Sequence, residues 1–531
     1  MAYSILAGLP PEVGLYASIA PPILYAFFGS SRALAVGPVA VASLMVASTL
    51  SQHAAVGTGE YYAAALILAF LIGSFLILMG VARLGFMANF LSHPVMSGFT
   101  SAAAIVIAFS QLANLFGLQI PRGLRIDEIT IFVINHLGDI NLATIIISTS
   151  SIVMLIFMQR YLGKALNRLC LPSGLAQGLS KAAPLFLVIL MTSTTAILSL
   201  DTSAGLAVVG TIPAGLPSLS LPYFGLTTLY DFALPAALIA LVSFVESVAI
   251  ARVLANKRRQ KIDVNQELIG LGVANVGAAF SGGSPVCGGF SRSAVNFSAG
   301  ANTQLAAILT ALLIGLSVLF FTPLFYFLPQ AVLAAIIVVA VLGLIDFGAI
   351  STAWNYNKGD AVSMMVAFIV VLIQGIEAGI VSGVVISIVL HLWRNSRPHI
   401  AIVGRIGDTE HFRNVERHQV KTCAGVLALR IDESLFFANA QYLENFILSV
   451  IAEKQNVKDI VLICSAVNAI DTSALESLEN LAADLGNAGV ILNLAEVKGP
   501  VMDRLSRTNL FDHLGNIYLS THDAFTDLKC A

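Results

Sequence analysis

Two segments rich in Gly, Pro and Ser interrupt long apolar stretches of this chain. The first runs from Ser30 to Ala40 and the second from Gly282 to Asn296, at corresponding places in the two halves. In each, a break in the helical pattern precedes a short helix, and the breaks fall at Gly37, Pro38, Pro285, Gly288 and Gly289. Paired interruptions of this kind indicate a membrane transport site built from two half-helices.

The chemistry of such half-helices favours an anion. A broken helix leaves its first N–H groups without partners inside the helix and directs the positive end of its dipole at the break. Two such ends that face each other, with serine and arginine side chains beside them, would bind an oxyanion. Ser291, Arg292 and Ser293 stand at the start of the second short helix.

Arg292 is the cation that such a site needs. Because a cation at the centre of a bilayer costs about 2.5–3.5 kcal/mol on insertion scales, we expect Arg292 to face the protein interior. It would either supply positive field to the anion or pair with a carboxylate and join two helices. Ser291 and Ser293 would either donate to the anion or cap the helix.

Glu246 is a second charge within an apolar stretch, in the run from Leu241 to Ala249. A carboxyl group isolated there favours its neutral form, which suits coupling to protons. The sequence allows two alternatives. Glu246 could bind Na⁺ together with Ser243 and Ser247 on the same helix face, or it could form an ion pair with Arg292.

The composition separates a membrane part from a soluble tail. The chain is 57% hydrophobic and only 11% charged, which excludes an ordinary soluble protein. Residues 1–398 hold 30 of the 58 charged residues, whereas the 133 residues that follow hold 28. We therefore predict a transmembrane domain over 1–398 and a soluble domain over 402–531. Near-neutral charge gives nucleic-acid binding no support.

The apolar stretches predict about fourteen crossings, with the first one shortened because only nine residues precede Pro10. Lys and Arg gather on one side of this arrangement, most densely over residues 257–261, which places both chain ends in the cytoplasm. The stretches that predict the longer crossings are Gly14–Phe28, Tyr62–Val81, Val95–Phe116, Leu142–Met158, Leu185–Leu200, Phe232–Val253, Thr303–Phe321, Phe325–Leu344, Val362–Leu372 and Ile380–Leu392.

The tail alternates strand and helix patterns, which predicts a compact α/β domain. Expected strands are Gly425–Ile431, Ile460–Ser465 and Val490–Leu494, and expected helices are Gln441–Lys454, Thr472–Leu485, Val501–Asn509 and Asp523–Leu528.

Other features favour structural roles. The five cysteines (Cys170, Cys287, Cys423, Cys464 and Cys530) lack metal-site or disulfide spacing, and Cys423 and Cys464 are expected to be reduced thiols. His93, His136 and His391 are isolated. No nucleotide-binding loop and no nucleophile–base set appears, so we predict neither an enzyme nor a cofactor beyond a coupling H⁺ or Na⁺.

Several motifs together resemble the SulP family of anion transporters, the sulfate permeases. They are Met1 to Pro11 with Gly14-Leu15-Tyr16, Ala35-Val36-Gly37-Pro38-Val39-Ala40, Asn265-Gln266-Glu267-Leu268 and Gly288 to Asn296. The resemblance covers essentially the whole chain. It implies a uracil-permease-like fold of two inverted seven-helix repeats, divided into core and gate and usually dimeric.

The resemblance also assigns residues. It implies an anion site that includes Tyr3, Val39, Ala40, Phe290, Ser291 and Arg292, and a coupling position at Glu246. The tail resembles a STAS domain, in which Asp471-Thr472-Ser473-Ala474 matches a loop that is phosphorylated in related antagonists. Ser473 is therefore a candidate phosphorylation site, although the interpretation that we favour is a helix cap. Cytosolic regulators are the partners this implies.

This sequence departs from the family pattern at two places. The family has a Pro-Gln pair before the position of Met1, and the glutamine helps line the site. It also commonly has Tyr and Thr where this chain has Ser284 and Cys287.

The predicted function is uptake of sulfate across the cell (inner) membrane, coupled to H⁺ through Glu246. A Na⁺-coupled bicarbonate or dicarboxylate carrier is an alternative of the same class. A signalling scaffold, in which the membrane part senses and the STAS domain responds, is an alternative of a different class.

Overall fold

The computed structural model of this protein describes residues 1–89, 92–120, 125–162, 182–213, 215–217, 219, 226–454 and 456–530. The chain divides into two compact units, Met1–Ser387 and Ile388–Ala531, which we call the membrane unit and the tail unit. The division falls inside one helix, α21 (Ile376–Asn395), close to the predicted end of the transmembrane domain at residue 398. Each unit is described by itself.

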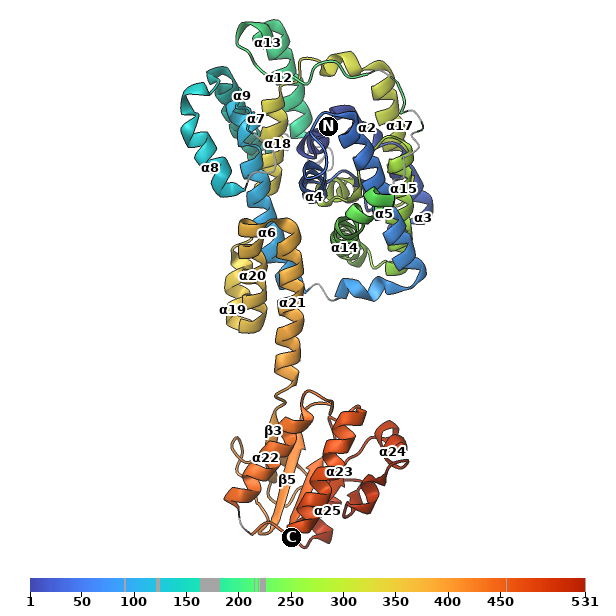
Figure 1. Ribbon diagram of the computed structural model, residues 1–531, viewed down its shortest axis with the longest axis vertical. Helices are drawn as coiled ribbons and strands as arrows, with labels where there is room; N and C mark the ends of the chain where they lie inside the picture. The colour runs from blue at the N-terminus through green and yellow to red at the C-terminus, as the bar shows by residue number, and fades with distance from the viewer. Residues whose placement is uncertain are drawn as a thin grey trace. The chain divides into compact units, whose positions relative to one another are not determined.

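The described residues of the membrane unit are almost entirely helical (Figure 1). Its first half contains a two-residue strand, β1 (Val36–Gly37), and the α-helices α1 (Ala2–Leu6), α2 (Pro11–Tyr16), α3 (Ala20–Phe28), α4 (Ala40–Ser51), α5 (Gly59–Val81), α6 (His93–Ser110), α7 (Leu112–Phe116), α8 (Ile126–Asn135), α9 (Leu142–Phe157), α12 (Ala183–Ile197) and α13 (Leu200–Ser203).

The second half also contains a two-residue strand that is followed by an α-helix. It contains α14 (Leu226–Lys257), α15 (Val264–Phe280), β2 (Cys287–Gly288), α16 (Phe290–Ser298), α17 (Leu305–Phe320), α18 (Gln330–Leu342), α19 (Gly348–Tyr356), α20 (Lys358–Gln374) and α21.

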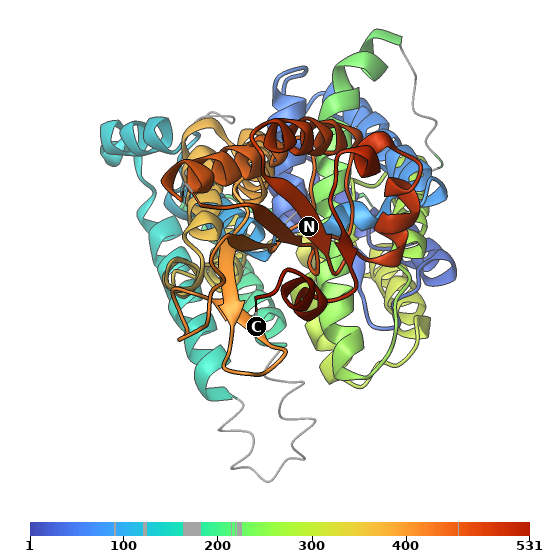
Figure 2. The ribbon, with the colours of Figure 1, turned by 90° about the horizontal axis from the view of Figure 1, so that it is seen from below.

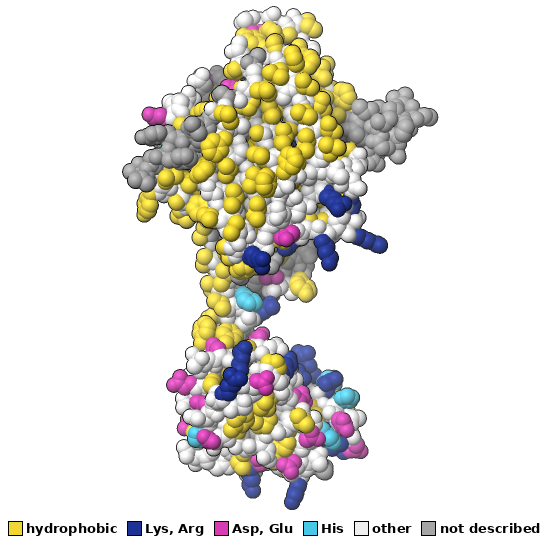
Figure 3. Space-filling view, turned by 90° about the vertical axis from the view of Figure 1, so that its right-hand side faces the viewer, with side chains coloured by type: hydrophobic (Ala, Val, Ile, Leu, Met, Phe, Trp, Pro, Cys, Tyr) yellow, Lys and Arg dark blue, Asp and Glu magenta, His cyan; other side chains and the backbone are white. Residues whose placement is uncertain are grey.

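Five helices in the described part of the chain are long and apolar enough to cross a membrane. They cover 59–81, 94–116, 142–162, 229–257 and 378–395, and four shorter apolar helices accompany them. On the face shown in Figure 3, hydrophobic side chains are spread over the membrane unit, whereas charged side chains are scattered over the tail unit. An apolar outer surface of this extent suits a lipid environment.

Helix α15 is closely packed within the membrane unit. It packs against α5 and α3, and glycines allow a close approach on both sides. A Cβ atom on Gly272 would lie 2.8 Å from the carbonyl oxygen of Gly73 in α5, and one on Gly270 would lie 2.6 Å from the Cα of Gly29. Small residues let membrane helices pack closely, so α15 is firmly held by its neighbours.

The tail unit is built on a six-stranded sheet in the order β4-β3-β5-β6-β7-β8. Pairs β3–β4 and β3–β5 are antiparallel, and the remaining pairs are parallel. The strands are β3 (Ile400–Arg405), β4 (Phe412–Asn414), β5 (Val426–Ile431), β6 (Asp459–Ile463), β7 (Ile491–Ala495) and β8 (Ile517–Tyr518), and the helices are α22 (Ala440–Glu453), α23 (Thr472–Asn487), α24 (Gly499–Leu505) and α25 (Thr521–Asp527).

Both faces of this sheet are covered, because the side chains of a strand alternate between its faces. Along β6, Ile460 and Leu462 belong to the apolar cluster under α22 and α23, whereas Val461 and Ile463 belong to the cluster that includes Phe525 of α25. Figure 2 shows the sheet between the longer helices on one side and the C-terminal helix, in dark red, on the other. The α/β architecture predicted for the tail is what the structure has, with β3, β4 and β8 in addition.

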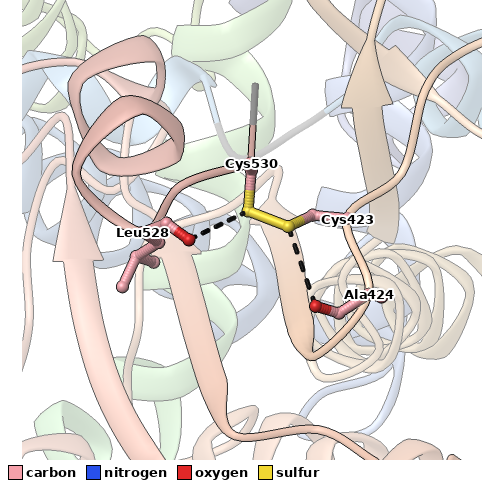
Figure 4. Close-up of a disulfide and its surroundings, with 4 residues drawn as sticks. All are labelled: Cys423, Ala424, Leu528 and Cys530. Carbon is pink, nitrogen blue, oxygen red and sulfur yellow. Dashed lines mark hydrogen bonds between the residues drawn. A yellow bond between two sulfur atoms is a disulfide. The ribbon is translucent and has the colours of Figure 1, made fainter.

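The prediction for the cysteines of the tail was partly wrong. Cys423 is joined to Cys530 in a disulfide whose Cα atoms lie 5.3 Å apart (Figure 4). The two residues are 107 positions apart in the sequence, so no short spacing could reveal the pair. Cys464 is a free thiol, and its burial raises its pKa to about 12. Cys170 lies outside the described residues.

Candidate functional site

Strands β1 and β2 bring the two Gly/Pro breaks side by side. They pair antiparallel, with Val36 opposite Gly288 and Gly37 opposite Cys287. A further backbone hydrogen bond, 3.1 Å long, runs from the Gly289 N–H to the Ala35 carbonyl. Two segments that are about 250 residues apart in the sequence therefore pair as the strands of one small antiparallel sheet.

Each strand leads almost directly into a half-helix. Helix α4 begins at Ala40, three residues after Gly37, and α16 begins at Phe290, two residues after Gly288. The N-cap residues, Val39 and Gly289, are extended, and neither makes a side-chain capping bond. Because the first N–H groups of a helix have no intrahelical acceptor, both helices offer donors and a positive dipole end beside the strand pair.

Arg292 joins the two breaks. Its guanidinium donates to the Pro38 carbonyl oxygen and lies so close to Gly37 that a Cβ there would overlap it. Val39 is also nearby, because a Cβ on Gly289 would lie 3.3 Å from Val39 Cγ2 and 3.8 Å from Arg292 Nε. The arginine is partly buried, as expected for a side chain that faces the protein interior.

Tyr3 and Glu246 are two further predicted site residues with ionisable side chains. Tyr3, on α1, lies within electrostatic range of both Arg292 and Glu246. Glu246, on α14, is partly buried. None of the ion pairs found among the described residues joins Glu246 to Arg292, so a static pair between them is not part of this structure.

Serine hydroxyls hold the strand pair from two helices. Ser247 on α14 accepts from the Gly288 N–H at 2.8 Å, and Ser293 on α16 accepts from the Ala35 N–H at 2.9 Å. Both serines are fully buried. The hydroxyl of Ser293 is thus bonded to the first break rather than capping its own helix, for which Gly289 is the N-cap.

The remaining predicted site residues differ in how deeply they are buried. Ala40 is buried and Val39 partly buried. The side chains of Phe290 and Ser291 lie outside the described part of the structure. Ser284 is buried, and Pro285 directly precedes the loop residue Val286.

In the tail unit, Ser473 is exposed in the first turn of α23. The cap of this helix is Asp471, whose side chain accepts from the Ala474 N–H at 2.8 Å. The favoured interpretation of Ser473 as a helix cap was therefore wrong. Its phosphorylation stays a prediction.

Two buried residues of α15 were not among the predicted site residues. Glu267 accepts hydrogen bonds from Tyr25, Ser30 and Ser31, which precede β1. Asn275 accepts from the Val286 N–H and donates to the Val286 carbonyl, just before β2. The sequence could have drawn attention to these residues, because an acidic and an amide side chain are unusual in an apolar helix. It could not reveal their hydrogen-bond partners.

This fold and this arrangement define a class of protein. A multi-helix membrane unit with two uncapped half-helices that meet at an arginine, followed by an α/β tail, is the architecture of a membrane transporter for anions. Residues 1–367 match the model of the sulfate permease family, and residues 417–524 match that of the STAS domain. The chain belongs to the sulfate permease family, and its tail is a STAS domain.

Curated relatives agree over nearly the whole chain. The chain is 36% identical over 541 residues to sulfate transporter 4.1, chloroplastic, of Arabidopsis thaliana, which covers 99% of this chain and 77% of that protein. It is 31% identical over 521 residues to a probable sulfate transporter of Mycobacterium tuberculosis, which covers 98% of this chain and 90% of that protein.

Solved structures agree with the fold. The murine Solute Carrier 26 family member A9 anion transporter, in its inward-facing state, superposes with a TM-score of 0.90 at 25% identity, over 100% of this chain and 89% of that one. The transmembrane domain of a cyanobacterial bicarbonate transporter, BicA, superposes with a TM-score of 0.61 at 23% identity, over 72% of this chain and 92% of that one.

Proposed function

We propose that this protein takes up sulfate by secondary active transport and that the anion binds between the N-termini of α4 and α16. The observation that carries the proposal is the convergence of two helix ends without side-chain caps at the guanidinium of Arg292. Backbone N–H groups and a fixed cation recognise an oxyanion without a dedicated pocket of polar side chains.

The guanidinium can serve both the protein and the anion. It carries five N–H donors, and donation to the Pro38 carbonyl leaves others for a substrate. In this proposal the anion is bound by Arg292, by the first N–H groups of α4 and α16, and by the neighbouring residues Tyr3, Val39, Ala40, Phe290, Ser291 and Ser293. The names of the curated relatives support sulfate as the substrate.

Glu246 is the proposed coupling residue, and H⁺ the proposed coupling ion. In this proposal, a partly buried carboxyl group within electrostatic range of Tyr3 gains and loses a proton as the anion enters and leaves. The structure gives Na⁺ less support. The Ser247 hydroxyl, one of the two candidate oxygen ligands beside Glu246, already donates to the Ser243 carbonyl and accepts from the Gly288 N–H.

The finer architecture is also part of the proposal. The transmembrane domain over residues 1–398 forms fourteen spans as two inverted repeats of seven. The STAS domain over residues 402–531 lies in the cytoplasm, where cytosolic regulators reach it. The protein works as a homodimer in the cell (inner) membrane.

The test is ion-substitution flux in proteoliposomes. Uptake of radiolabelled sulfate is measured with an imposed proton gradient, with a Na⁺ gradient and with neither, and bicarbonate is measured in parallel. We expect sulfate uptake that follows the proton gradient and that Glu246→Gln uncouples, so that uptake in the variant no longer responds to pH. Sulfate uptake that follows the Na⁺ gradient would show that Na⁺ is the coupling ion, and uptake of bicarbonate but not sulfate would show that bicarbonate is the substrate. If neither anion is taken up under any gradient, the proposal that this protein is a carrier is wrong.

A further inference from the structure

A carboxylate lies buried in the membrane unit without a cationic partner. Glu267 on α15 is fully buried, and it takes part in none of the ion pairs found among the described residues. Its two oxygens instead accept four hydrogen bonds. Oε1 accepts from the Ser30 N–H at 2.8 Å, the Ser30 hydroxyl at 2.7 Å and the Ser31 N–H at 2.7 Å, and Oε2 accepts from the Tyr25 hydroxyl at 2.7 Å.

The four donors all belong to the chain that leads into the first half-helix. Tyr25 lies in α3, and Ser30 and Ser31 lie between α3 and β1. Four hydrogen bonds from this short segment to one fully buried side chain fix the segment tightly. The position of β1 and of the N-terminus of α4 therefore depends on a side chain that is at least 236 residues away in the sequence from the residues that donate to it.

Asn275 plays the matching part for the second half-helix. This fully buried side chain accepts from the Val286 N–H at 2.9 Å and donates to the Val286 carbonyl at 2.8 Å, directly before β2. Glu267 and Asn275 stand eight residues apart on α15, which is about 12 Å along the helix axis. Since α15 is itself packed closely against α5 and α3, it holds both segments at a set separation.

We propose that Glu267 is a positioning residue for the anion site: through its bonds to Tyr25, Ser30 and Ser31, and with Asn275 at the other break, it sets where the N-termini of α4 and α16 meet. The inference rests on the proposed function, because the site it positions is the proposed anion site. Glu267 does not touch the anion. It acts through the backbone that does.

Two variants of Glu267 distinguish the effect of its hydrogen bonds from the effect of its charge. In Glu267→Gln, the amide oxygen can accept the three bonds from Ser30 and Ser31, and the Tyr25 hydroxyl can rotate to accept from the amide nitrogen. Glu267→Ala removes all four acceptors. Thr195→Val is the matched control, because Thr195 is fully buried in α12 and its hydroxyl donates only to the Met191 carbonyl of its own helix.

The full-length protein, purified and reconstituted in proteoliposomes, is tested for sulfate KM, maximal rate, size-exclusion profile and melting temperature. We expect Glu267→Ala to raise the KM by about tenfold or more, because the site must then form from misplaced helix ends. Glu267→Gln should return the KM to within about twofold of wild type, and Thr195→Val should leave it unchanged. The positioning role would be wrong if Glu267→Ala left the KM unchanged and lowered the maximal rate only as much as it lowered the amount of folded protein.

A second measurement does not depend on transport. Cys287 in β2 is a free, fully buried thiol, so N-ethylmaleimide labelling of its peptide, followed by mass spectrometry, reports on the strand pair. We expect labelling to accelerate about tenfold in Glu267→Ala and to stay slow in Glu267→Gln. Equal labelling in all variants would overturn the inference. If wild type moves neither sulfate nor bicarbonate, the proposed function fails while this measurement still decides the inference.

If Glu267→Ala gives no folded protein, the double variant Tyr25→Phe/Ser30→Ala takes its place. It removes two of the four donors and keeps the carboxylate and its bonds from the Ser30 and Ser31 N–H groups. A KM raised by about threefold would support the positioning role. An unchanged KM with unchanged Cys287 labelling would overturn it.

Discussion

The two half-helix segments share one plan but differ in charge. Both place a two-residue strand before a short helix, and the strands pair with each other. Helix α4 contains no charged residue, whereas α16 contains Arg292. The side chains of α15 that bond to these segments show the reverse pattern. The acidic residue Glu267 bonds to the first segment, and the neutral amide of Asn275 bonds to the second. Two similar halves can therefore build one asymmetric site, in which the second half supplies the cation and the first supplies backbone.

The strongest test of this asymmetry is to remove the cation. Arg292→Ala should lower sulfate uptake by about 10- to 100-fold, because a charge-assisted contact to the anion and the bond to Pro38 are both lost. Arg292→Lys should recover part of the loss, since it keeps the charge but has a single nitrogen for the Pro38 carbonyl and the anion. Uptake in proteoliposomes measures both variants.

Arg32 provides the control for this first test. It is an exposed cation just before the first strand, so Arg32→Ala removes a charge of the same kind from outside the site. Equal losses in Arg32→Ala and Arg292→Ala would mean that general positive charge, and not the position of Arg292, matters.

A methyl group added to each break should have unequal effects. A Cβ at Gly37 would overlap the guanidinium of Arg292, whereas a Cβ at Gly289 would lie 3.3 Å from Val39 Cγ2, a tight contact that a small shift of this side chain relieves. We expect Gly37→Ala to lower uptake by about tenfold and Gly289→Ala by no more than about threefold. Equal effects of the two variants would contradict the view that the guanidinium lies against the first break.

The two serine bonds should have smaller and similar effects. Ser293→Ala leaves the Ala35 N–H without its acceptor, and Ser247→Ala does the same to the Gly288 N–H. A buried donor left without a partner costs about 1–3 kcal/mol, which thermal unfolding in detergent would register as a lowered melting temperature. Ser→Thr at either position keeps the hydroxyl and separates its loss from the effect of side-chain size. Wild-type stability in both Ala variants would mean that the strand pair does not depend on these hydroxyls.

The position of the two breaks, but not the proposed binding of an anion there, can be compared with the sequence-based expectation. The Gly/Pro breaks at Gly37-Pro38 and Gly288-Gly289, and the arginine just after the second, are recognisable within a few residues of sequence. The antiparallel pairing of β1 and β2 then follows the prediction that the two helix ends meet. The long helices α5 and α9 also lie where apolar runs placed them.

What escaped prediction depends on contacts between distant residues. The role of Glu267 requires knowledge of partners more than 230 positions away, and that of Cys423 requires a partner 107 positions away. The break between α2 and α3 was missed because the run Gly14–Phe28 contains no charged residue, although Ser18 and the pair Pro21-Pro22 lie at the break. Strands β4 and β8 have only three and two residues, too few for an alternating pattern to be recognised.

The disulfide of the STAS domain makes residues 423–530 a closed covalent ring. The ring contains β5 to β8 and the helices α22 to α25, whereas β3 and β4 lie outside it. A protease that cuts the loop between two of the enclosed elements would leave both fragments attached through sulfur. On a denaturing gel, such a nicked domain would migrate as one chain until a reductant divides it in two.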